Sequence, residues 1–302
     1  MAIYDCFTFF NELELLELRL NVLNDIVDHF VLVEADMTFS NHKREFLFEE
    51  KFNWFKDHLN KIIYVKVEDM PDSTNPWDLE YYQRNCIMRG LKKAQPEDLV
   101  LISDIDEIPD PEAIKALFRG RGTIVNLLPF RNPIKIVKRI LDFSSSLCRP
   151  YHGIEILEKT PVCFKQRLFY YFLNCQSPLS WNGTVILKAK NLESPQKLRD
   201  QLKVLPRLLN GGWHFSYLGG VEKIMDKINS YSHTELNTPQ INTKNFIEKK
   251  IENGEGIFGQ TKLKCQNKFV KIDSGFPCYI KALIEKYPYL YHETAGSTDR
   301  II

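Results

Sequence analysis

The sequence has no long apolar run. Within its 302 residues, no stretch approaches the roughly 20 apolar residues that a membrane-spanning helix needs. Met1 is followed by AIYDCFTFF, which has neither the basic start nor the long apolar core of a secretory signal. We therefore expect a cytoplasmic protein.

An excess of charge and a cysteine framework are absent as well. Forty lysines and arginines face 39 acids, so the net charge of +1 gives no global footprint for nucleic acid, which we do not expect as a partner. Seven scattered cysteines, an odd number without a Cys-x-x-Cys pair, argue against a zinc site and a disulfide framework. With 44% hydrophobic residues, the chain is expected to fold into an ordinary globular protein.

The most informative segment is LVLISDIDEIP, residues 99–109. It reads as a buried strand that ends in the carboxylates Asp104, Asp106 and Glu107. Mg²⁺ and Mn²⁺ prefer oxygen ligands, so Asp104 and Asp106 predict a metal site. The alternative is that Asp-x-Asp is only solvated surface charge.

Strands alternate with helices before this segment. Strands are expected at 3–10, 30–34 and 62–67, and helices from Asn11, where Asn11 and Glu14 look like a capping box, and over 78–94. This alternation predicts an α/β fold with a mostly parallel central sheet, flanking helices, and strands that all end on one side.

Acids also follow the first two strands. Glu12 follows the first strand, and Glu34 and Asp36 follow the second. Ligands of open α/β sheets bind at the carboxyl ends of strands, so Glu34 and Asp36 are candidates for ligand contact. Glu12 could instead serve only the helix N-terminus.

Arg84 lies four residues after Glu80 on the helix expected before residue 99. This spacing is typical of a surface ion pair. The functional alternative is that Arg84 contacts a nucleotide or diphosphate, because a guanidinium matches phosphate oxygens.

A basic amphipathic stretch occupies residues 131–147, where Arg131, Lys135, Lys138 and Arg139 are interleaved with apolar residues. We favour a packed helix with a solvated basic face. The alternative is peripheral contact with an anionic membrane surface.

Paired glycines bracket a short aromatic strand in NGGWHFSYLGG, residues 210–220, and imply unusual backbone conformations or close approach to a ligand. His214 in its middle is a candidate metal ligand or diphosphate contact, although a lone histidine is more often a satisfied core residue. Downstream, the sequence SHTE contains His233 and Glu235, which could supply an acid or base.

Taken in order, YDCFTFFNELELLELRL, FVLVEADMTF, SDIDEIPDP, RLFYYFLN, W-NGT and GGWHFSYLGG-EKI-KI-S-SH-E resemble glycosyltransferase family 17, from about Ile3 to Tyr287. The resemblance implies one GT-A-type catalytic domain over 1–302. Residues 1–128 would form its nucleotide-sugar half and 129–302 its acceptor half with the C-terminal helices.

The resemblance also implies a UDP-sugar donor, most often UDP-N-acetylglucosamine, a glycan acceptor, Mn²⁺ or Mg²⁺, and inversion at the anomeric carbon. Asp106 would hold the metal, Asp104 would reach the ribose or a metal-bound water, and His214 would ligate the metal or diphosphate. Asn11 is grouped with Asp104, Glu34, Asp36 and Arg84 as a donor-binding residue.

An acceptor hydroxyl needs a base, and we expect Glu235 in this role, with His233 and Glu107 as alternatives. Two other functions compete with glycosyl transfer. A phosphohydrolase of haloacid dehalogenase type also places Asp-x-Asp after a strand, but Gly-Thr or Gly-Val follows there, whereas Glu107-Ile108-Pro109 follows here. A non-catalytic glycan-binding protein would also explain the aromatic content.

Overall fold

The computed structural model of the chain describes residues 1–125, 153–257 and 266–293. The basic stretch predicted at 131–147 lies outside these residues. None of the described helices combines the length and the apolar content that crossing a bilayer requires.

The first part of the chain alternates strands with helices, as predicted. Its elements are β1 (Ile3–Thr8), α1 (Leu13–Leu23), β2 (His29–Ala35), α2 (Leu47–Glu50), β3 (Ile62–Val67), α3 (Pro76–Asn85), α4 (Ile87–Gly90), β4 (Leu99–Asp104), β5 (Glu107–Pro109), α5 (Pro111–Phe118) and β6 (Ile124–Val125). The helix expected over 78–94 is interrupted at Cys86, where one helix ends and the next begins.

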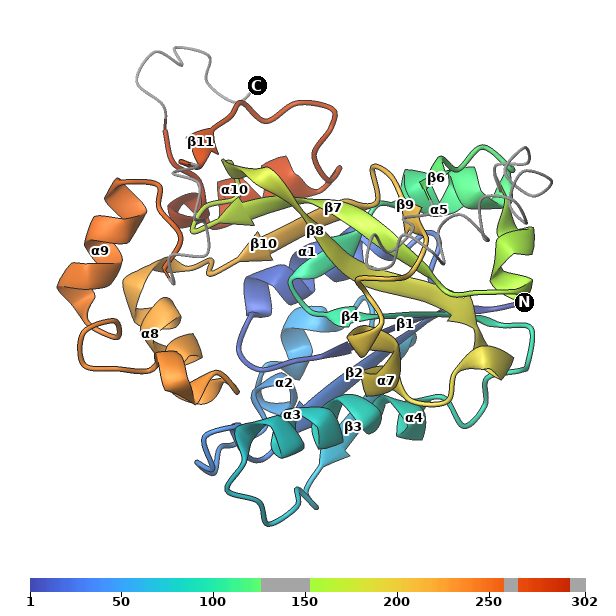
Figure 1. Ribbon diagram of the computed structural model, residues 1–302, viewed down its shortest axis with the longest axis horizontal. Helices are drawn as coiled ribbons and strands as arrows, with labels where there is room; N and C mark the ends of the chain where they lie inside the picture. The colour runs from blue at the N-terminus through green and yellow to red at the C-terminus, as the bar shows by residue number, and fades with distance from the viewer. Residues whose placement is uncertain (126–152, 258–265, 294–302) are drawn as a thin grey trace, which may run out of the picture.

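The later part contributes longer strands and the helices α8 and α9, which pack on each other. Its elements are β7 (Val162–Tyr170), β8 (Cys175–Lys188), α7 (Pro195–Asp200), β9 (Arg207–Leu208), β10 (Gly212–Ser216), α8 (Gly220–Ser230), α9 (Lys244–Glu252), β11 (Lys268–Phe269) and α10 (Ile280–Lys286). Figure 1 shows α8 and α9 beside one end of the sheet.

The α/β class is confirmed, but the sheet is mixed, so the expectation of a mostly parallel sheet is wrong. The main strand order is β3-β2-β1-β4-β8-β7-β10-β5, and only its first four strands form a continuous parallel run. β8 runs antiparallel to both β4 and β7. Only residues 171–174 separate β7 from β8, and so short a connection permits a hairpin, whereas a parallel pair needs a long crossover.

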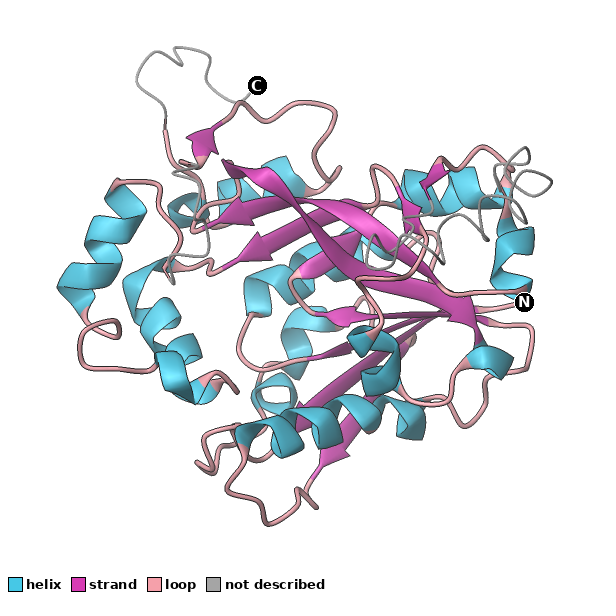
Figure 2. Cartoon of the chain, viewed as in Figure 1, coloured by secondary structure: helices cyan, strands magenta, loops and turns pink. Residues whose placement is uncertain are grey.

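Helices cover both faces of the parallel strands (Figure 2). Along β4, Leu99 and Leu101 pack in the core beneath α1, while Val100 and Ile102 pack in the core beneath α4 and α7. All four side chains are fully buried. Burial on both faces explains the continuous apolar run of this strand.

The predicted capping box at the start of α1 does not form. Helix α1 is preceded by Glu12, without a side-chain cap. The Glu12 carboxylate instead accepts from the main-chain nitrogens of Phe10 and Asn11 at 3.3 and 3.0 Å. The Glu14 carboxylate forms an ion pair with Lys223 instead, and Lys223 Nζ lies 2.6 Å from Glu14 Oε2.

The order β3-β2-β1-β4 creates a switch point between β1 and β4. The chain leaves β1 toward β2 on one side, and β4 lies on the other side. Thr8 at the end of β1 is the register partner of Asp104 at the end of β4. A crevice at such a point is where open α/β sheets bind ligands.

Candidate active site

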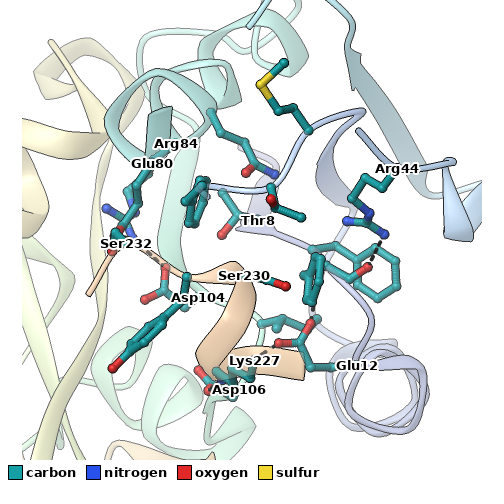
Figure 3. A pocket seen from close by; sticks show the side chains of 18 residues that line it. Thr8, Glu12, Arg44, Glu80, Arg84, Asp104, Asp106, Lys227, Ser230 and Ser232 are labelled. Atoms are coloured by element: carbon teal, nitrogen blue, oxygen red, sulfur yellow. Dashed lines mark hydrogen bonds and ion pairs between the residues drawn. The ribbon is translucent and has the colours of Figure 1, made fainter. Parts of the chain in front are cut away.

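A pocket of about 170 Å³ opens at this switch point. In Figure 3, Glu80, Arg84 and Ser232 lie together on one side and Arg44 lies on the other. The lining residues come from four segments of the chain, within 8–12, 37–44, 80–106 and 227–232. Asp104 and Asp106, the residues of the predicted metal site, both line the pocket.

Two arginines from different helices bind the Asp104 carboxylate. Arg84 Nη2, on α3, lies 3.1 Å from Asp104 Oδ1, and Arg199 Nη2, on α7, lies 3.0 Å from Asp104 Oδ2. The same nitrogen of Arg84 also reaches Glu80, at 2.6 Å. Arg84 is therefore not merely half of a surface ion pair, because its side chain is 7% exposed and lines the pocket.

Asp106 faces an ammonium and an imidazole. Lys227 Nζ, on α8, lies 2.9 Å from Asp106 Oδ2, and His214 Nε2, on β10, lies 3.4 Å from Asp106 Oδ1. Lys227 also lies 3.8 Å from Glu12 Oε1. Asp106 and His214, which the sequence analysis grouped together, are thus neighbours.

A fully buried arginine shapes the turn that carries these acids. Arg19 on α1 donates through Nη1 to the main-chain oxygens of Asp104 and Glu107, both at 3.0 Å. Its other nitrogens bind the Asp5 carboxylate at 2.6 and 2.7 Å. The turn is therefore fixed from beneath by an ion pair in the core.

Glu107 points away from the pocket into the protein. Arg199 donates to both of its carboxylate oxygens, at 2.7 and 2.8 Å, and Trp181 Nε1 donates at 2.6 Å. The residue is 1% exposed and is not part of the pocket lining. This geometry favours a positioning role for Glu107 over the role of base.

Glycine allows β10 to bring His214 to this turn. β10 pairs antiparallel with β5, so that His214 lies opposite Glu107 and Gly212 opposite Pro109. Gly212 has φ +128°, and a Cβ there would lie 2.2 Å from the Ile108 oxygen. The unusual backbone expected from the paired glycines is confirmed at this position.

The electrostatics keep both aspartates ionised. Burial by itself would raise the pKa of Asp106, but Lys227 and His214 outweigh it and hold that pKa far below its usual range. Burial likewise opposes ionisation of Asp104, and Arg84 and Arg199 lower its pKa despite it. Lys227 stays protonated because Asp106 and Glu12 raise its pKa against the effect of burial.

As arranged, these donors do not fit a divalent cation. All four carboxylate oxygens of Asp104 and Asp106 face nitrogen groups of the protein at 2.9 to 3.4 Å. Among the described residues, no three His, Cys, Asp or Glu side chains are grouped to share a metal ion. His214 contributes one unusual feature, because its Nδ1 is buried without a hydrogen-bond partner in the described part of the chain.

The other predicted donor-binding residues lie outside this pocket. Glu34 is fully buried and accepts from Arg44, Tyr64 and two main-chain nitrogens at the start of α2, at 2.7 to 3.1 Å. Asp36 and Asn11 are half-buried and do not line the pocket. Arg44, the partner of Glu34, does line it.

The predicted base lies beside the pocket rather than in it. Glu235 Oε1 and His233 Nδ1 are 2.7 Å apart; the Glu235 side chain is exposed, and that of His233 is partly exposed. His233 packs edge-on against Trp77 with ring centroids 4.5 Å apart. The preceding residue, Ser232, lines the pocket and donates to Glu80.

The sequence analysis missed the cations of the site. Lys227 is 121 residues from Asp106, and Arg199 is 95 residues from Asp104, so no local pattern links them. Lys227 does fall within the EKI-KI motif of the family resemblance, which is the signal that could have identified it.

Comparison with known proteins places a family match in the amino-terminal part of the chain. Residues 1–129 match the model of glycosyltransferase family 17. The β-1,4-mannosyl-glycoprotein 4-β-N-acetylglucosaminyltransferases of Homo sapiens and Rattus norvegicus are 29% identical to the chain over 112 residues, which is 34% of this chain and 21% of each relative. The match thus spans about a fifth of the length of these relatives.

One solved structure shares a distant likeness. The 2-C-methyl-D-erythritol 4-phosphate cytidylyltransferase of Francisella tularensis aligns over 69% of this chain and 90% of its own, with a TM-score of 0.32 and 8% identity. So weak a likeness has no bearing on the site. The family match does bear on the site, because the residues that match the model of glycosyltransferase family 17, 1–129, contain β1 to β5 with Asp104 and Asp106.

Proposed function

We propose that the protein transfers a sugar from a nucleotide-sugar donor, UDP-N-acetylglucosamine in the first instance, to a hydroxyl of a glycan acceptor. The observation that carries this proposal is the pocket at the β1–β4 switch point, which lies mainly within the family-matched residues. A GT-A-type fold is part of the proposal, since it would place the nucleotide at these strand ends.

The basic groups that line the pocket would bind the diphosphate of the donor. Lys227 and Arg84 line the pocket and present an ammonium and a guanidinium. Positive charge placed at the leaving diphosphate stabilises the negative charge that develops there as the glycosidic bond breaks. Asp104 and Asp106 would orient these cations, and Asp104 also lies where it could accept from a ribose hydroxyl.

The acceptor would enter from the side of residues 231–235. Tyr231 and Ser232 line the pocket, and Glu235 lies just beyond them. The hydrogen bond from His233 lowers the pKa of Glu235, so the carboxylate is ionised at neutral pH and ready to take a proton from the attacking hydroxyl. Attack opposite the departing diphosphate would invert the anomeric carbon.

The competing phosphohydrolase would need a free carboxylate as its nucleophile. Here Arg84 and Arg199 bind the two oxygens of Asp104. Lys227 and the His214 imidazole lie against the two oxygens of Asp106. Carboxylates held in this way are better suited to binding than to nucleophilic attack. A glycan-binding protein without catalysis would need no nucleotide site.

The test is calorimetric titration of UDP into the protein, once with Mn²⁺ and once with EDTA, followed by measurement of UDP released from UDP-N-acetylglucosamine. We expect UDP to bind, and we expect Asp106→Asn to weaken binding strongly. Asp110→Asn is the matched control, because Asp110 caps α5 outside the pocket and asparagine can keep that cap. Absence of UDP binding in both conditions would overturn the proposal.

A further inference from the structure

A hydrogen bond joins the acceptor side of the pocket to the helix that holds Asp104. The Ser232 hydroxyl donates to Glu80 Oε2, and the other carboxylate oxygen of Glu80 accepts from Arg84 Nη2 at 2.6 Å. The same nitrogen of Arg84 donates to Asp104 Oδ1 at 3.1 Å. Figure 3 shows Ser232, Glu80 and Arg84 together at one side of the pocket. A continuous chain of polar contacts therefore runs from Ser232 to Asp104.

Ser232 is the buried point of an otherwise accessible segment. Among residues 231–240, all of which the structure describes, Ser232 alone is buried, with 3% of its surface exposed. The larger side chains of Tyr231 and Leu236 are only half-buried. A buried hydroxyl needs a hydrogen-bond partner, and Glu80 provides it. The position of the segment therefore depends in large part on this polar anchor.

Helix α3 contacts both the segment that carries Glu235 and the acids of the pocket. Trp77, Glu80 and Arg84 follow one another at spacings of three and four residues, which places them on one face of the helix. Trp77 contacts the His233 ring, with the centroids 4.5 Å apart, and Glu80 binds the neighbouring serine. One face of α3 thus relates the predicted base to the donor side of the pocket.

We propose that Glu80 and Ser232 are positioning residues for the base of glycosyl transfer: Glu80 holds Ser232, and Ser232 fixes the segment that carries Glu235 at a set distance from the donor. This inference rests on the proposed function, in which Glu235 takes the proton of the acceptor hydroxyl. Both residues act through Glu235, three residues after Ser232, and not on the substrate themselves. Misplacing a reacting group by about 1 Å can cost about 100-fold in rate.

The inference predicts a loss of turnover without a loss of donor affinity. Removing the Ser232 hydroxyl leaves the ion pairs of Arg84 with Glu80 and with Asp104 in place, so the donor side should stay intact. Ser232→Ala should therefore lower kcat by about 10- to 100-fold, while the donor KM and the Kd of UDP stay unchanged. Its pH profile should keep the wild-type shape at a lower level, because the base is displaced rather than removed.

The test is a double-mutant cycle of Ser232→Ala with Glu235→Gln, in which kcat is measured as acceptor-dependent release of UDP from UDP-N-acetylglucosamine. If Ser232 acts through the Glu235 carboxylate, Ser232→Ala should have no further effect in the Glu235→Gln background. A merely structural role would lower kcat by the same factor in both backgrounds. It would also reduce the number of UDP sites per chain that calorimetry counts.

Ser73→Ala is the matched control. Ser73 also donates to a carboxylate on α3, that of Asp78, with 2.8 Å between Ser73 Oγ and Asp78 Oδ2. It lies outside the pocket lining, so its substitution should change neither kcat nor the affinity for UDP. Ser232→Thr keeps the hydroxyl and should recover most of the turnover. Ser232→Cys, whose thiol donates only weakly, replaces Ser232→Ala if that variant unfolds, which circular dichroism establishes.

Three results would overturn the inference while leaving the proposed function intact. The first is that Ser232→Ala keeps the full turnover number. The second is that it loses the same factor in kcat in the Glu235→Gln background as in the wild type. The third is that its affinity for UDP falls by the same factor as kcat. A wild-type protein that binds no UDP, or that shows no acceptor-dependent release of UDP, would overturn the proposed function itself.

Discussion

Arg19 and Asp104 are joined across the core: the guanidinium of Arg19 donates at 3.0 Å to the main-chain oxygen of Asp104. Arg19 lies on α1, 85 residues before Asp104, and both Arg19 and its partner Asp5 are completely buried. An internal ion pair thus connects the first strand to the turn that bears the acids of the site.

Replacing Arg19 with methionine is therefore expected to destabilise the protein and to loosen that turn. Asp5 would be left as an unpaired buried charge, and losing one partner of a buried pair costs about 3–5 kcal/mol. Urea unfolding at neutral pH measures the change in the free energy of unfolding.

The double variant Asp5→Asn with Arg19→Met is the control, because it removes the stranded charge as well. We expect it to be more stable than Arg19→Met alone, which a double-mutant cycle quantifies. Equal stability of the two variants would show that the pair does not contribute as argued.

The sequence predicted the parts of the fold that depend on local pattern. The runs that became β1 to β4 are continuous and apolar because both faces of the sheet are covered, and this signal placed Asp104 and Asp106 at a strand end. The direction of β8 could not be predicted in the same way. The short connection to β7 accounts for one antiparallel pairing, but the insertion of β8 beside β4 is a contact between distant segments that no local spacing encodes.

In the site, too, local sequence pattern predicts some residues, whereas others are brought in by contacts between distant segments. Its acids follow a strand and are visible in the sequence, whereas Arg199 and Lys227 come from helices that follow much later in the chain. The capping box failed for a related reason: the spacing of Asn11 and Glu14 was correct, but Lys223 and Tyr289, more than 200 residues away, bind the Glu14 carboxylate. Tertiary contacts outweighed the local preference.

Replacing Glu235 with glutamine is expected to lower kcat by roughly 100-fold or more, the usual size of a general-base contribution. The donor KM should stay unchanged, since Glu235 lies outside the pocket. Because the hydrogen bond from His233 lowers the pKa of Glu235, wild-type activity should persist through the pH range in which an ordinary glutamate becomes protonated and fall only at more acidic pH. Steady-state rates over a pH series measure both effects.

The variant Glu107→Gln helps to decide which of two carboxylates, Glu107 or Glu235, acts as the base. Glu107 is bound by Arg199 and Trp181, so its loss should lower the free energy of unfolding and raise the donor KM through displacement of Asp104. If Glu235→Gln keeps the full turnover number while Asp106→Asn abolishes activity, Glu235 is not the base.

Trp77 is expected to contribute to acceptor binding. It lies on α3 one turn before Glu80 and Tyr81, contacts His233, and is half-buried at the side of the pocket. An aromatic ring offers a large, flat apolar surface against which the apolar face of a sugar ring can pack. Trp77→Ala should raise the acceptor KM several-fold in a transfer assay and leave the affinity for UDP unchanged.

Trp54→Ala is the matched control for this prediction, because Trp54 is 57% exposed and lies outside the pocket lining. The Trp54→Ala substitution should change neither the acceptor KM nor the affinity for UDP. A weakened affinity for UDP in Trp77→Ala would assign Trp77 to the donor side instead.

The ion pairs of Asp106 predict how stability depends on pH. The folded protein lowers the pKa of Asp106, so its interactions stabilise the fold above the ordinary carboxyl pKa of about 3.9 and are lost as the pH falls toward the depressed value. At neutral pH, Asp106→Asn should therefore be less stable than the wild type by roughly 1–3 kcal/mol, the cost of leaving a buried partner unsatisfied.

The difference between the wild type and Asp106→Asn should shrink as the pH falls below about 4, because the unfolded wild-type chain then takes up a proton at this carboxyl, which the folded protein resists. Urea unfolding from pH 7 to pH 3 follows this difference, with Asp110→Asn as the control at a carboxyl whose pKa burial raises rather than lowers. For that control the sign is reversed: protonation favours the folded state, so the wild type should gain relative stability at low pH. A difference for Asp106→Asn that stays constant down to pH 3 would mean that the charge of Asp106 does not stabilise the fold.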